Sequence, residues 1–94
     1  MEQQYVKAHF IYIKKIVEKN ISYPPMARRM GWQGKVVVSF VVCLNGEVEN
    51  LQVIKSSGYT QLDKNALETI MQVKPFPNPP VRVKLVLPVT YRMT

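Results

Sequence analysis

The stretch KVVVSFVVCLNGEVENLQVIK, residues 35–55, decides the fold of this chain. Two segments rich in β-branched residues, 35–44 and 47–55, flank Asn45-Gly46. That pair favours a β-hairpin, because both central positions of a type I′ turn need positive φ. One face of the first segment carries Val36, Val38, Phe40, Val42 and Leu44. Its other face is also largely apolar, so we expect this strand at the centre of a sheet and the more polar second strand nearer an edge.

Helical periodicity appears on both sides of this hairpin. In residues 5–20 the apolar side chains recur at spacings of three and four, which indicates an amphipathic helix that ends before Tyr23-Pro24-Pro25. Residues 62–73 show the same periodicity. The preceding Thr60-Gln61-Leu62-Asp63 fits a capping box that would start this second helix.

The last apolar segment, residues 81–92, reads VRVKLVLPVTYR and carries an apolar residue at every odd position from 81 to 91. It is expected to be a strand with one buried face. Because Pro88 has no N–H to give to a neighbouring strand, this strand should lie at a sheet edge. The predicted fold is therefore an α+β two-layer sandwich. An N-terminal helix (about 5–20) precedes a β-β-α-β core (about 23–93) with a three-stranded antiparallel sheet, and residues 1–94 form one domain.

The composition argues against most enzymatic chemistry. The chain has one cysteine, Cys43, and one histidine, His9, which leaves no obvious metal ligand set and only one candidate nucleophile–base pair. Cys43 lies among valines and is better interpreted as a small apolar residue. Glycine loops of the kind that cradle phosphates are absent from the sequence. We expect a protein that is not an enzyme and that uses no cofactor or metal.

The charge points to an acidic partner. Thirteen Lys and Arg against six Asp and Glu give a net charge of +7. Nucleic-acid binding is disfavoured, because the basic residues are spread along the chain and the aromatic residues Phe40 and Tyr91 fall on faces expected to be buried. An exposed edge strand could instead accept an extended peptide as an additional strand. A protected edge without a partner remains an equally good interpretation at this point, and an exposed edge also allows a dimer that depends on the length of the chain.

The ordered motifs resemble the C-terminal periplasmic domain family of TonB, the energy-transducing protein of Gram-negative bacteria. The resemblance covers residues 23–93. Its motifs are Tyr23-Pro24, Ala27-Arg28 before Gly31 and Gly34, the Asn45-Gly46 turn, Ser56-Ser57-Gly58, Leu62-Asp63 with Ala66-Leu67, Pro75-Phe76-Pro77, and Leu87-Pro88-Val89 with Tyr91. One departure is Asn45, where the family often has Asp.

The resemblance implies a function that composition alone does not. It implies a periplasmic domain of a protein anchored in the inner membrane, where ExbB and ExbD harness the proton-motive force. Such a domain grips the TonB box of an outer-membrane transporter by strand addition and pulls on it. This drives uptake of iron siderophores, haem, nickel complexes or cobalamin. The alternatives are a TonB-like module of another envelope system and a basic nucleic-acid-binding domain.

By the same resemblance, the TonB box adds beside the last strand. The residues expected to contact it are Val81, Arg82, Val83, Lys84, Leu85, Val86, Leu87, Val89 and Tyr91. A polar position before the Tyr-Pro pair maps near Asn20, and Tyr23 and Pro24 are expected close to the same edge.

Overall fold

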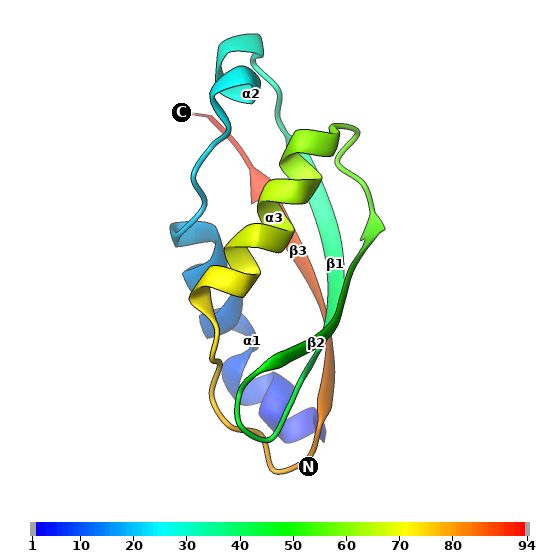
Figure 1. Ribbon diagram of the computed structural model, residues 1–94. Coiled ribbons are helices and arrows are strands. Elements are labelled where there is room, and N and C mark those ends of the chain that lie inside the picture. The colour runs from blue at the N-terminus through cyan, green and yellow to red at the C-terminus, as the bar shows by residue number, and fades with distance from the viewer. Residues whose placement is uncertain (1, 94) are drawn as a thin grey trace.

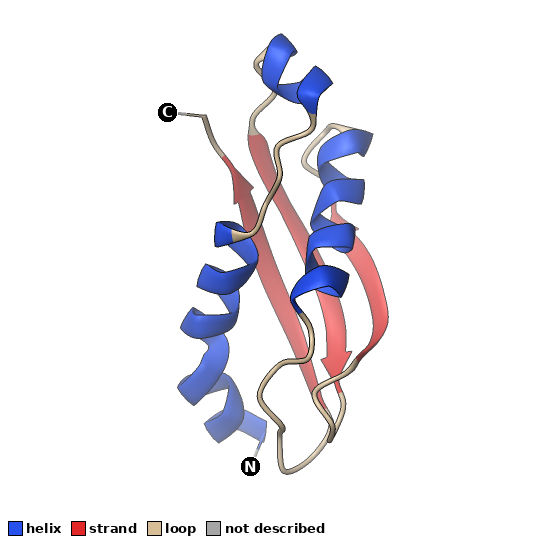
Figure 2. Ribbon diagram, turned by 60° about the vertical axis from the view of Figure 1, so that its left-hand side comes forward, coloured by secondary structure: helices blue, strands red, loops and turns tan. Residues whose placement is uncertain are grey.

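The computed structural model describes residues 2–93, which fold into helices packed on a single sheet (Figure 1). In chain order the elements are α1 (Glu2–Lys19), α2 (Pro25–Met30), β1 (Gly34–Val42), β2 (Val48–Lys55), α3 (Thr60–Val73) and β3 (Val83–Tyr91). The sheet is antiparallel with strand order β2-β1-β3, and α1 and α3 cover the same face (Figure 2). The expected α+β sandwich, with the first strand at the centre and the last at an edge, is confirmed. The first helix begins at Glu2, earlier than the predicted start near residue 5.

β1 lies at the centre of the sheet, and its side chains alternate between the core and the uncovered face. Val36, Val38, Phe40 and Val42 are at most 1% exposed, beneath the two helices. Side chains on the opposite face, such as Val37 and Val41, are half-buried. Within residues 2–93 no helix covers that face (Figure 2). The core thus lies on one side of the sheet, and the other side is open to solvent.

The β1–β2 hairpin is confirmed, but the predicted type I′ turn is wrong. The Gly46 N–H donates to the Cys43 carbonyl at 2.8 Å, so Leu44 and Asn45 are the central residues, and neither has positive φ. Gly46 follows with a φ of +83°, the pattern of a type I turn with a glycine bulge. Leu44, which was expected in the first strand, therefore lies in the turn and is 57% exposed.

The segment before β3 packs against this turn and accompanies its observed type. The Phe76 N–H donates to the Gly46 carbonyl at 2.9 Å, and a Cβ on Gly46 would collide with the Phe76 carbonyl oxygen. Phe76 is 4% exposed and stacks on Phe40 with ring centroids 5.8 Å apart. The proline-rich connector before β3 is thereby fastened to the hairpin.

The predicted capping box at the start of α3 is wrong. Tyr59 is the N-cap and makes no side-chain capping bond, and Thr60 is already helical. The Asp63 carboxylate turns back to the preceding loop, where it accepts hydrogen bonds from the Ser57 N–H at 2.9 Å, the Ser57 hydroxyl at 2.8 Å and the Ser56 hydroxyl. Burial raises the pKa of Asp63, but these hydrogen bonds outweigh it and the pKa is lowered. Asp63 therefore fastens the end of β2 to α3.

Candidate functional site

β3 forms one edge of the sheet, and β2 forms the other. Along β3 the odd-numbered side chains enter the core and are at most 2% exposed; they are Val83, Leu85, Leu87, Val89 and Tyr91. The even-numbered side chains point to the uncovered face, where Lys84 and Val86 are exposed. β1 pairs with β3 along its entire length, from Gly34 opposite Tyr91 to Val42 opposite Val83.

The register defines which backbone groups of β3 face away from β1. In an antiparallel pair, opposed residues alternate between those that exchange hydrogen bonds and those that do not. Pro88, opposite Val37, has no N–H to exchange, and the Thr90 N–H donates to a side chain outside the sheet. By alternation, the N–H and C=O groups of Lys84 and Val86 also point out of the edge. The exposed edge thus consists of backbone groups at even positions.

This geometry divides the residues expected at the peptide site. The odd-numbered residues of β3 present neither side chain nor backbone to the open edge, since they are committed to the core and to β1. Lys84 and Val86 present both backbone groups there. Val81 and Arg82 precede the strand, and the Arg82 guanidinium pairs with the Glu49 carboxylate of β2.

Tyr23 and Pro24 lie at the C-terminal end of β3. The Tyr23 ring packs edge-on against Tyr91, with centroids 5.6 Å apart at 78°, and its hydroxyl donates to the Trp32 carbonyl. Pro24 is the N-cap of α2. Asn20 follows α1, and its side-chain amide donates to the Ile16 carbonyl at 2.7 Å. The structure therefore brings the Tyr-Pro pair to the end of the predicted edge, in a packing role.

Tyr91 anchors this end of the strand. Its hydroxyl donates to the Asn65 side-chain oxygen at 2.6 Å, and the Asn65 amide donates to the Ser22 carbonyl at 2.9 Å. Burial raises the pKa of Tyr91, and the negative charge of Asp63 adds to this effect. The phenol therefore stays neutral and holds β3, α3 and the segment before Tyr23 together.

Sequence reasoning missed Glu18, whose carboxylate reaches the edge from α1. Its Oε2 accepts the Thr90 N–H at 3.0 Å and also pairs with the Lys14 ammonium at 2.9 Å. In the sequence Glu18 looks like one more charged residue on the polar side of the first helix. The only available signal is the spacing of four from Lys14, which places both side chains on one flank of the helix.

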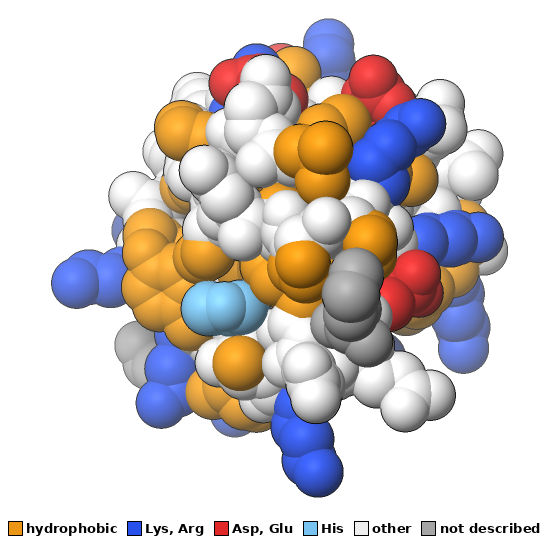
Figure 3. All heavy atoms as spheres, turned by 90° about the horizontal axis from the view of Figure 1, so that it is seen from below, with side chains coloured by type: hydrophobic (Ala, Val, Ile, Leu, Met, Phe, Trp, Pro, Cys, Tyr) orange, Lys and Arg blue, Asp and Glu red, His pale blue; other side chains and the backbone are white. Residues whose placement is uncertain are grey.

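Basic side chains outnumber acidic ones in this chain. Seen from the end at which α1 begins, Lys and Arg side chains project around the rim and acidic side chains are fewer (Figure 3). Along the edge itself Lys84 is exposed on the uncovered face, whereas Arg82 and Lys14 already have carboxylate partners. A peptide with acidic side chains would meet an attractive field here.

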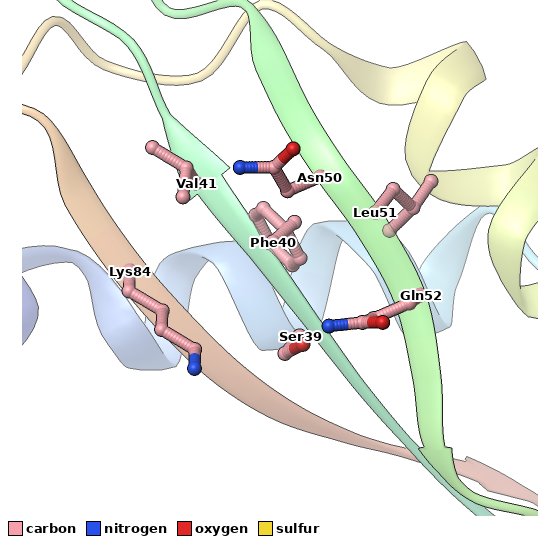
Figure 4. A pocket seen from close by; sticks show the side chains of 7 residues that line it. All are labelled: Ser39, Phe40, Val41, Asn50, Leu51, Gln52 and Lys84. Atoms are coloured by element: carbon pink, nitrogen blue, oxygen red, sulfur yellow. The ribbon is translucent and has the colours of Figure 1, made fainter.

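A shallow polar hollow of about 360 Å³ lies on the uncovered face of the sheet (Figure 4). Its lining residues, from all three strands, are Ser39, Phe40, Val41, Asn50, Leu51, Gln52 and Lys84. They include no carboxylate, histidine or cysteine. Among residues 2–93 no cluster of His, Cys, Asp and Glu could hold a metal ion. Cys43 lines a different hollow, next to Arg82, whereas His9 packs on Tyr5 of α1 with centroids 4.7 Å apart.

Comparison with known proteins places these features in a family. The family described as Gram-negative bacterial TonB protein C-terminal matches residues 19–93. Protein TonB of Campylobacter coli is 35% identical over 83 residues, covering 87% of this chain and 36% of that protein. Protein TonB of Pasteurella multocida is 32% identical over 91 residues, covering 95% of this chain and 36% of that protein. The chain thus spans about a third of the length of these curated relatives.

A solved structure shares the fold over nearly the whole chain. The NMR solution structure of Helicobacter pylori TonB-CTD superposes with a TM-score of 0.82 at 31% identity, covering 99% of this chain and 92% of that chain.

Proposed function

Because this chain belongs to the family of Gram-negative bacterial TonB C-terminal domains, we propose that it binds outer-membrane transporters in the periplasm and transmits force to them. The bound segment is the TonB box, which adds as a strand beside β3. The protein performs no catalysis and uses no cofactor. The exposed backbone of Lys84 and Val86 at the open edge is the observation that carries this proposal, since strand addition needs unpaired N–H and C=O groups.

Strand addition suits a domain that must resist pulling. Each backbone hydrogen bond contributes only about 0.5–1.5 kcal/mol net in water, so a short edge supports modest equilibrium affinity. When the peptide is pulled along the strand direction, however, its hydrogen bonds are loaded together and must break together. β3 is itself bonded to β1 along nine opposed residues and buried on its core face, so the load passes into the centre of the sheet.

The proposed function also requires components that generate the force. We propose that ExbB and ExbD supply energy from the proton-motive force through the membrane-anchored part of the full protein. The nutrients imported would be those of TonB-dependent transporters, such as iron siderophores, haem, nickel complexes or cobalamin. The basic surface would favour a TonB box with acidic residues.

Titration of the isotope-labelled chain with a TonB-box peptide, followed by backbone amide NMR, tests this proposal. We expect the largest shifts at Lys84 and Val86. A peptide of the same composition in scrambled order is the control. If the TonB-box peptide causes no shifts while an oligonucleotide shifts Arg28, Arg29 and Lys35, the domain binds nucleic acid instead. Shifts confined to the hollow around Gln52 would mean that the peptide does not add to β3.

A further inference from the structure

At the C-terminal end of the open β3 edge, one backbone N–H is already hydrogen-bonded to a side chain of α1. The Glu18 carboxylate accepts the Thr90 N–H at 3.0 Å and is held in place by Lys14 at 2.9 Å. Glu18 and Lys14 are each less than a third exposed, so this contact is partly shielded from water. It occupies the last outward-facing N–H of β3, at a position that an added strand would otherwise use.

α1 accompanies β3 over most of the strand. Near the start of the helix, the Tyr5 hydroxyl donates to the Pro77 carbonyl, which precedes β3, at 2.7 Å. Near its end, Glu18 contacts Thr90. Helix and strand therefore run in the same direction, as Figure 2 shows. Glu18 lies thirteen residues after Tyr5, about 20 Å further along the helix. Glu18 thus reaches the edge only at its C-terminal end.

We propose that Glu18 limits the edge available to a peptide to residues 84–88 and so sets where an added strand stops. This inference rests on the proposed function, because it concerns the same edge. Pro88 has a carbonyl but no N–H, and the Thr90 N–H is already satisfied. A peptide of about five residues fills the free segment. A longer peptide gains nothing at Thr90 unless Glu18 leaves, and Lys14 then loses its partner.

Hydrogen exchange in the free chain tests the contact without any peptide. The Thr90 amide should exchange more slowly than those of Lys84 and Val86. Glu18→Ala should accelerate Thr90 exchange about 2- to 13-fold, the range that one hydrogen bond gives. Glu18→Gln keeps an acceptor oxygen but loses the charge, so its rate should be intermediate. Glu47→Ala is the matched control, since that carboxylate pairs with Lys74.

Alanine is the best helix former, so α1 should persist in Glu18→Ala. Unchanged exchange at Val17 checks this. An unchanged Thr90 rate in Glu18→Ala would overturn the proposal, whatever the peptide does.

Two peptides from one TonB box, of five and nine residues, then test the limit on length. We expect the ratio of their affinities to be about 2- to 13-fold larger for Glu18→Ala than for the unmodified chain. The five-residue peptide should bind both alike. If both bind but the ratio is the same in the two proteins, Glu18 does not limit the strand and this inference alone fails. If neither peptide binds either protein, the proposed function fails as well.

Discussion

Replacing Val86 with proline probes the open edge at an exposed position. The Val86 N–H points away from β1, because Val86 shares the parity of Pro88 and Thr90. Proline at this site therefore removes an edge donor and breaks no bond between β1 and β3. The neighbouring Pro88 already occupies the same orientation in the same strand. We expect Val86→Pro to fold, with a stability loss of about 1 kcal/mol.

The loss in binding follows from one hydrogen bond. A backbone bond to the TonB box is worth about 0.5–1.5 kcal/mol net, so the Kd for the peptide should rise about 2- to 13-fold. Isothermal titration calorimetry against one TonB-box peptide measures this change, and urea unfolding confirms that the variant is folded.

Val86→Ala is the matched control. It trims the same side chain, which is 48% exposed, but keeps the N–H. Its Kd should stay close to that of the unmodified chain. Equal weakening by Ala and Pro would mean that the peptide contacts the side chain rather than the backbone. Unchanged affinity in a folded Val86→Pro protein would mean that the box docks elsewhere.

Three further predictions concern the scaffold behind the edge. Asp63 has a lowered pKa, so its contribution is present above the ordinary Asp pKa of about 3.9 and is lost as pH falls through the folded-state value; Asp63→Asn should flatten the loss of stability in acid measured by urea unfolding at several pH values, and an unchanged profile would contradict the role given to Ser56 and Ser57. Gly46→Ala should cost about 2 kcal/mol or more, because it combines a φ of +83° with a collision against Phe76, and a neutral result in thermal unfolding would refute this view of the turn. Phe76→Ala should cost about 3–5 kcal/mol by losing the stack on Phe40, and Phe76→Leu should recover most of it; equal losses would contradict a packing role.

Period-two patterning made the sheet predictable. Because every odd position of residues 81–91 is apolar, the buried face of β3 followed from the sequence, and Pro88 marked the edge. The central place of β1 followed from apolar residues on both of its faces. These inferences need only local spacing, and the structure bears them out.

The features that the sequence did not predict involve contacts formed only in the folded chain. Asn45-Gly46 suits two kinds of turn, and the contact of Gly46 with Phe76, thirty residues later, accompanies the one observed. In the sequence, Asp63 is equally compatible with a capping box and with hydrogen bonds to the preceding serines. The Glu18–Thr90 bond joins residues 72 positions apart, so it needs the packing of α1 on β3 to be known.

The pairing register between β1 and β3 could not be predicted from the sequence either. The sequence shows which side chains of β3 are buried, but the direction of each N–H follows only from pairing with β1. This is why the predicted contact residues included Leu85 and Leu87, whose backbone faces β1, and left out Pro88 and Thr90.

Amide exchange in the complex tests the central claim most directly. The unmodified chain is exchanged with and without a saturating TonB-box peptide, and rates are compared along β3. We predict that Lys84 and Val86 slow markedly on binding, while Leu85 and Leu87, already bonded to β1, change little. Slowing of odd and even positions alike, or of neither, would contradict strand addition at this edge.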